Sequence, residues 1–286
     1  MALPYVPASS FRALGIQPYG VLLLLGLTAG VLVVWRLARR FAIPGTDLAV
    51  LLPVAVAVAV IGAHGVDVVA YQWDRAADDP SLWMRFLDGT SLFGALLGVA
   101  LTTMIVVRAR GLDLALFADL VAVGCLTAMT LGRIGCALVH DHPGLPTDSI
   151  FGIDYPTETL RWANVRGDGP VIRAHDLGLA ELLVLLPMLA VTFALIRQRL
   201  RVGTVAAVLA IAYGCARFGL DFLRLPATEP THAGLTFGQW SSLVLIGVGL
   251  IQLARTRTRH VAPLATEHGG QVGGRHRATL PSAIRT

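Results

Sequence analysis

Seven apolar stretches, each long enough to cross a lipid bilayer, constrain the fold of this 286-residue chain more than any other feature. A hydrocarbon core about 30 Å thick takes roughly 17–25 helical residues to cross. The stretches cover residues 19–37, 48–69, 92–107, 114–139, 177–196, 205–222 and 237–254. Only 14% of the residues are charged, against roughly a quarter in a soluble domain. The sequence therefore predicts an all-α polytopic membrane helix bundle of about seven transmembrane helices.

The basic residues, all of them arginine, are distributed unevenly between the loops. They follow the first, third, fifth and seventh stretches, at positions 36, 39, 40, 108, 110, 197, 199, 201, 255, 257 and 259. Because cytoplasmic loops are enriched in basic residues, we expect the N-terminus outside and the C-terminus in the cytoplasm of a bacterial plasma membrane. The same topology accounts for the net charge of +5 without nucleic acid as a partner.

One connection is too long for a simple hairpin. Residues 140–176 contain several prolines and glycines together with the aromatic residues Phe151, Tyr155 and Trp162. We expect them to form a small ordered cap on the outer face, partly strand and partly irregular. Residues 1–254 would then form one transmembrane unit that includes the cap. Residues 255–286 would form a disordered, basic cytoplasmic tail.

Two arginines inside the apolar stretches are candidates for function, because a charge at the centre of a membrane helix costs at least about 2.5 kcal/mol. Arg133 lies between glycines in the run Gly-Arg-Ile-Gly, and Arg217 shares a helical face with Asp221 and Arg224. A guanidinium stays charged at low dielectric and binds two phosphate oxygens at once. The alternative is a structural ion pair between helices, which would leave some of these arginines uncompensated.

Several segments resemble, in the same order, the motifs of the bacterial prolipoprotein diacylglyceryl transferases. The first is the Gly-Arg-Ile-Gly run at residues 132–135. The others are Tyr19-Gly20, residues 91–98 (SLFGALLG), the ends of the element from His175 to Glu181, residues 213–224 (YGCARFGLDFLR, with Asp221 in place of a glutamate) and residues 235–239 (LTFGQ). The likeness extends over nearly the whole chain.

The resemblance implies a reaction at the outer leaflet of the bacterial inner membrane. Enzymes of this family transfer diacylglyceryl from phosphatidylglycerol to the lipobox cysteine thiol of a prolipoprotein signal peptide and release glycerol phosphate. By this resemblance Arg133 and Arg217 act in catalysis and bind the phosphate region. The resemblance also places Tyr19, Tyr213, Asp221, Arg224, His175 and Glu181 in the substrate site. The family implies no metal and no cofactor.

The sequence departs from the family pattern at functionally important positions. The family's histidine in the third stretch is Phe93 here, and the asparagine after Gly-Arg-Ile-Gly is Cys136. A phenylalanine cannot accept a proton, so a diverged relative that binds lipid or lipoprotein without transfer is an alternative. If the chain is a transferase, we expect His64 to act as the base, with Asp67 three residues later orienting its ring. The competing interpretation is a histidine satisfied by helix packing.

Two further interpretations concern metal binding and transport. His140 and His142 flank Asp141, the position of the family's next acidic residue, and a His-x-His pattern is compatible with a metal. Without further ligands in the pattern, a polar turn is favoured. A membrane transporter is the alternative from another functional class. It is disfavoured because the sequence has no inverted repeat and no pair of broken helices.

Overall fold

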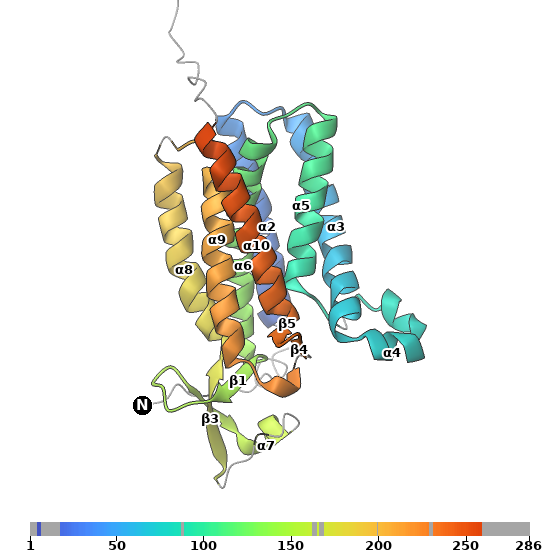
Figure 1. The fold of residues 1–286 in the computed structure, drawn as a ribbon, viewed down its shortest axis with the longest axis vertical. Helices are drawn as coiled ribbons and strands as arrows, with labels where there is room; N and C mark the ends of the chain where they lie inside the picture. Colours follow the sequence, from blue (N-terminus) through green and yellow to red (C-terminus); the bar gives the residue numbers. More distant parts are fainter. Residues whose placement is uncertain are drawn as a thin grey trace, which may run out of the picture.

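The computed structural model describes residues 5–6, 18–86, 89–161, 165, 169–198, 200–228 and 231–258. Within these residues, seven helices are long and apolar enough to span a membrane. They are α2 (Pro18–Arg40), α3 (Gly45–Tyr71), α5 (Leu92–Ala109), α6 (Leu114–Val139), α8 (Leu177–Ile196), α9 (Thr204–Leu220) and α10 (Phe237–Thr258). They run side by side as one bundle (Figure 1), which confirms the predicted all-α membrane architecture. Most of the expected tail and Trp162 lie outside the described residues.

Glycines allow the long helices to pack closely in pairs. Helix α2 lies along α6, α3 along α5, and α9 along α10. A Cβ added at Gly30 of α2 would lie 2.6 Å from the carbonyl oxygen of Gly124 in α6. A Cβ added at Gly62 of α3 would likewise lie 2.6 Å from the carbonyl oxygen of Gly94 in α5. Small residues of this kind let helix backbones approach in lipid, where association depends on van der Waals packing.

Apolar side chains fill the centre of the bundle and also cover its outside. The central cluster includes the buried residues Leu48, Phe117 and Leu185 from three different helices. In contrast, Ile105 is 63% exposed and Val244 is 67% exposed. A soluble protein avoids large contiguous apolar surfaces of this kind, whereas a bilayer solvates them.

The arginine-rich loops gather at one end of the bundle. The connections after α2, α5 and α8 and the last turn of α10 lie at the top of Figure 1. At this end Arg110 forms a 2.7 Å ion pair with Asp47, which joins α5 to α3. Asp119 of α6 accepts backbone hydrogen bonds from Gly203 at 2.6 Å and Ala206 at 2.7 Å. Asp119 therefore caps the start of α9 from a neighbouring helix.

The cap, residues 140–176, lies at the opposite end of the bundle (Figure 1). Its sheet has the antiparallel order β1-β3-β2, from β1 (Pro143–Pro146), β2 (Ile153–Pro156) and β3 (Val171–Asp176), and the short helix α7 (Thr157–Leu160) follows β2. Ile153, Tyr155, Leu160 and Ala174 form its own small apolar core. The expected ordered cap with strands is therefore present.

Short elements at the cap end were not expected from the sequence. They are α4 (Trp73–Asp78), η1 (Pro80–Met84), η3 (Asp221–Leu223), η4 (Pro226–Thr228), and the strands β4 (Thr231–His232) and β5 (Leu235–Thr236), which pair with each other. Helix η3 extends α9, and β5 leads directly into α10. These two elements position side chains of the candidate site.

Candidate functional site

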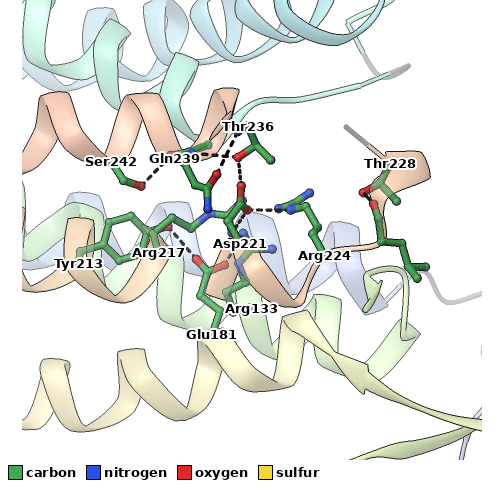
Figure 2. Close-up of polar contacts among 12 residues, drawn as sticks. Arg133, Glu181, Tyr213, Arg217, Asp221, Arg224, Thr228, Thr236, Gln239 and Ser242 are labelled. Carbon is green, nitrogen blue, oxygen red and sulfur yellow. Dashed lines mark hydrogen bonds and ion pairs between the residues drawn. The ribbon is translucent and has the colours of Figure 1, made fainter. Parts of the chain in front are cut away.

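Charged side chains from three membrane helices meet at the cap end of the bundle (Figure 2). Arg133 of α6 forms an ion pair with Glu181 of α8, at 2.9 Å between Nη2 and Oε2. The hydroxyl of Tyr213 in α9 donates a 2.8 Å hydrogen bond to Oε1 of the same carboxylate. Glu181 thus joins the Gly-Arg-Ile-Gly segment to the segment that begins at Tyr213.

A second carboxylate holds two arginines. Asp221 accepts from Arg217 at 2.7 Å and from Arg224 at 2.8 Å, both through Oδ1. The three residues lie together as expected, but not on one continuous helical face, because Asp221 lies in the 3₁₀ turn η3 and Arg224 follows it in an extended conformation. Backbone pairing between Arg224 and Gly144 of β1 fixes this turn against the cap.

The first turn of α10 closes the site with a capping box. The Thr236 hydroxyl accepts from the Gln239 backbone N–H, and the Gln239 side chain accepts from the Thr236 backbone N–H, both at 3.1 Å. The same hydroxyl donates to Oδ2 of Asp221. A Cβ on Gly238 would lie 2.8 Å from that oxygen and 3.3 Å from Nη2 of Arg217. The segment at residues 235–239 therefore both starts a helix and supports the arginine–carboxylate cluster.

Arginine side chains are concentrated in the cluster. Among the described residues, the three guanidinium groups of Arg133, Arg217 and Arg224 are held by the two carboxylates of Glu181 and Asp221. The side chains of Arg133 and Arg217 are 15% and 7% exposed. Because Asp221 is shared between two guanidinium groups, its charge is divided between them in a largely buried place, where charge is expensive. A site of this composition favours an anionic ligand.

Tyr19 lies beside the Gly-Arg-Ile-Gly segment. A Cβ on Gly135 would lie 3.1 Å from the Tyr19 Cα, so this glycine lets α2 approach α6 here. Tyr19 also interacts electrostatically with Arg133 and Cys136. Nη1 of Arg133 lies 3.6 Å from the Cys136 sulfur. Tyr19 is therefore placed at the edge of the arginine cluster.

Phe93 forms part of an aromatic group next to the cluster. The ring centroids of Phe93 and Phe237 lie 6.5 Å apart, edge to face, and the Tyr71 ring centroid lies 5.6 Å from that of Phe237. Phe237 is followed directly by Gly238, where an added Cβ would contact Asp221 and Arg217. The side chain at position 93 is therefore close to the site, but it contributes an apolar surface.

The expected pair of His64 and Asp67 is wrong. The His64 ring nitrogens lie 3.0 Å from the carbonyl oxygen of Leu82 and 3.3 Å from that of Gly89. Asp67 accepts instead from the Gln72 side chain at 2.6 Å. His64 is 1% exposed and holds the segment after α3 against that helix. The structure gives His64 no contact with the arginine cluster among the described residues.

A second polar group joins the cap to the bundle. Asp176 caps α8 by accepting from the Leu179 backbone N–H at 2.8 Å. It also accepts from His140 at 2.7 Å and from the Tyr155 hydroxyl at 2.9 Å. Burial, together with the nearby Asp176 carboxylate, raises the pKa of Tyr155. The adjacent His175 lies beside Gly144, the residue that pairs with Arg224.

One group near Arg133 was not identified as a unit from the sequence. Donor atoms of Cys136, Asp141 and His142 all lie within 4.8 Å of one another. Nδ1 of His142 is hydrogen-bonded to Oδ1 of Asp141. The three residues are of types that hold metal ions, although Arg133 places a positive charge beside the cysteine sulfur. The His-x-His pattern pointed to this turn, but Cys136 was not connected to it.

Comparisons with known proteins identify the family of this chain. A family model described as prolipoprotein diacylglyceryl transferase matches residues 8–255. A phosphatidylglycerol–prolipoprotein diacylglyceryl transferase of Leifsonia xyli is 30% identical, with 90% of this chain and 78% of that protein covered. Proteins of the same name from Gloeobacter violaceus (30% identical; 86% and 91% covered) and Geobacter sulfurreducens (29%; 92% and 100%) are also similar. The chain therefore belongs to the prolipoprotein diacylglyceryl transferase family.

Proposed function

We propose that this protein transfers the diacylglyceryl group of phosphatidylglycerol to the lipobox cysteine thiol of prolipoprotein signal peptides, at the outer leaflet of the bacterial inner membrane. Family membership supports the reaction class. The observation that carries the proposal for this chain is the largely buried cluster in which Glu181 and Asp221 hold the guanidinium groups of Arg133 and Arg217 in place. Such a cluster suits the single negative charge of a phosphodiester.

The chemistry accounts for the use of arginine. The acceptor sulfur forms a bond to the glyceryl carbon that carries the phosphate ester, and the carbon–oxygen bond breaks. The electron pair of that bond goes to the departing glycerol phosphate, so negative charge increases on the phosphate oxygens. Guanidinium groups held in place by Glu181 and Asp221 would stabilise this charge without reorganising during the reaction.

Each site residue has a role in this proposal. Arg133 and Arg217 contact the phosphate, while Arg224 adds charge from the cap side. Glu181 and Asp221 fix the guanidinium planes, and Tyr213 fixes Glu181. Tyr19, with His175 beside the Arg224 turn, lines the edge where substrate would approach.

The test measures glycerol phosphate release from phosphatidylglycerol vesicles containing the purified protein, with and without a lipobox peptide. Arg217→Ala and Arg133→Ala are expected to abolish most release. A charge-assisted hydrogen bond contributes about 1.5–3 kcal/mol, so removing either guanidinium should lower the rate roughly tenfold or more. Arg217→Lys and Arg133→Lys should keep only part of the activity. The lysine ammonium is a point charge, and it lacks the planar set of N–H donors with which a guanidinium binds two oxygens.

Arg173→Ala is the matched control, because Arg173 is a partly exposed cap residue paired with Asp154 rather than with the cluster. This variant should keep the wild-type rate. Wild-type lipid binding and turnover in Arg217→Ala would contradict the assignment of the phosphate site. Binding of phosphatidylglycerol by the wild type without any peptide-dependent release would instead indicate a non-catalytic relative in which Phe93 has replaced the family histidine.

A further inference from the structure

A histidine oriented by a carboxylate lies beside the arginine cluster, at the junction of α6 and the cap. Nδ1 of His142 donates to Oδ1 of Asp141. The backbone of His142 is fixed as well, because its carbonyl oxygen accepts from Leu177 N–H at 2.9 Å, at the start of α8. This hydrogen bond to the helix that carries Glu181 fixes the position of the histidine relative to the site.

The position of the ring relative to the cluster follows from two contacts. The Cys136 sulfur lies 3.6 Å from Nη1 of Arg133 and within 4.8 Å of a donor nitrogen of His142. Cys136 is buried, whereas the His142 side chain is 34% exposed. The partly exposed imidazole therefore lies close to the Arg133 end of the cluster, at the junction of α6 with the cap.

We propose that His142, oriented by Asp141, accepts the proton of the acceptor thiol; this inference rests on the proposed function. With Nδ1–H donated to Asp141, Nε2 carries the free lone pair. The thiol proton moves to Nε2 as sulfur bonds to the glyceryl carbon and the carbon–oxygen bond breaks. The imidazolium then gives the proton to the released phosphate or to water, which restores the neutral ring.

The other described histidines are placed less well for this role. His64 is buried, and both ring nitrogens face backbone carbonyls. His140 is bonded to Asp176 with only 8% of its side chain exposed, and its ring packs next to those of Tyr5 and Tyr155. His175 and His232 form no ion pair with a carboxylate in the described part of the chain.

The same three donors could alternatively bind a divalent cation. The positive charge of Arg133, which donates to the Cys136 sulfur, opposes a second cation at that position. The hydrogen bond between His142 and Asp141 also occupies two of the three donors with each other. We therefore favour the proton acceptor and make metal binding an outcome of the test.

The experiment follows lipobox-peptide-dependent release of glycerol phosphate from phosphatidylglycerol vesicles across pH, using the full-length purified protein. Positioned general bases contribute about 10²–10⁴-fold. His142→Ala and His142→Gln should lower the rate by that factor and remove the acidic limb of the pH–rate profile, with lipid binding unchanged. Asp141→Asn should give a smaller loss with a displaced limb, since it changes only the orientation of the ring. His232→Ala, an exposed histidine at the same end, is the matched control.

Neighbouring charged groups also influence the pH at which the acidic limb falls. Among the described residues, the charged and titratable groups around His142 and its partners are Arg133, Cys136 and His140 at α6, Tyr19 of α2, Glu181 of α8, and Asp141. A wild-type rate and acidic limb in His142→Ala would overturn the inference. A loss of activity in His64→Ala but not in His142→Ala would also overturn it. Activity that EDTA removes and Zn²⁺ restores would overturn it as well, in favour of a metal site. A wild-type protein that transfers nothing would overturn the proposed function itself and this inference with it.

Discussion

Gly238 illustrates how little room the site leaves for a single extra atom. A methyl group there would lie 2.8 Å from Asp221 Oδ2 and would press on Arg217. Gly238→Ala should therefore reduce glycerol phosphate release at least about tenfold, because Asp221 and the guanidinium must shift, and roughly 1.4 kcal/mol corresponds to a factor of ten. Gly219→Ala in the preceding helix meets no atom within 4 Å and should leave release unchanged. Equal rates for the two variants would contradict this account of the site.

Tyr155 makes the cap sensitive to alkali. Burial and Asp176 raise its pKa above the ordinary value of 10.0. The hydroxyl therefore stays protonated in the folded cap while an unfolded chain would lose its proton, so stability falls as the pH rises above about 10. We expect thermal unfolding in detergent to occur at progressively lower temperature above this pH. Tyr155→Phe should weaken that dependence, and an unchanged alkaline slope would mean that another group causes it.

Contacts between single residues could be predicted from the sequence where helical spacing alone brings the residues together, and not where the chain folds back. Arg217 and Asp221 were recognised because helical spacing alone brings them together. The same spacing rule failed for His64 and Asp67. The Asp67 carboxylate is hydrogen-bonded to the Gln72 side chain, and the His64 ring faces backbone carbonyls of the segment that folds back after α3. The position of His142 depends on the left-handed conformation of His140 (φ 52°), which turns the chain back toward the last turn of α6. No local pattern encodes that reversal.

Among the elements, the start of α9 depends on a side chain from another helix. Asp119 accepts from two backbone N–H groups there, and Gly203 adopts φ +89° to allow it. Asp119→Ala should lower the free energy of unfolding by about 1.5–3 kcal/mol, because hydrogen bonds to a charged group are lost. Thermal unfolding in detergent measures the change. Asp148→Ala, an exposed cap residue, serves as control, and an equally small effect of both variants would contradict a capping role.

The long helices were predictable because bilayer thickness fixes their length, and their apolar composition needs no tertiary information. The short elements were not. Helix α4 and η1 fold against α3 through a small apolar cluster that includes Val68 and Leu82. The β4–β5 pair leads into the capping box at Thr236, whose function as a helix start is readable from Thr-x-x-Gln. Its second role, the contact with Asp221, emerges only from the packing of α9 against α10.

For the whole molecule, the arginine-rich end is expected in the cytoplasm and the cap outside. A cysteine introduced at Ala278 should resist a membrane-impermeant maleimide in intact cells and react only after permeabilisation. A cysteine at Asp148 in the cap should react at once. Both are compared with the parent protein, which carries Cys125, Cys136 and Cys215. Labelling of position 278 in intact cells would show that the topology is the opposite of the expected one.

Two polar links between α6 and α8 have a mechanical consequence. Arg133 pairs with Glu181, and about two helical turns further on His140 is bonded to Asp176. Sliding one helix past the other by a single turn, about 5.4 Å, would break both links at once. The two links therefore fix the register of α6 against α8, and with it the position of the cluster relative to the cap. Any movement of helices that catalysis needs would then fall on the α3–α5 pair, which packs mainly on itself.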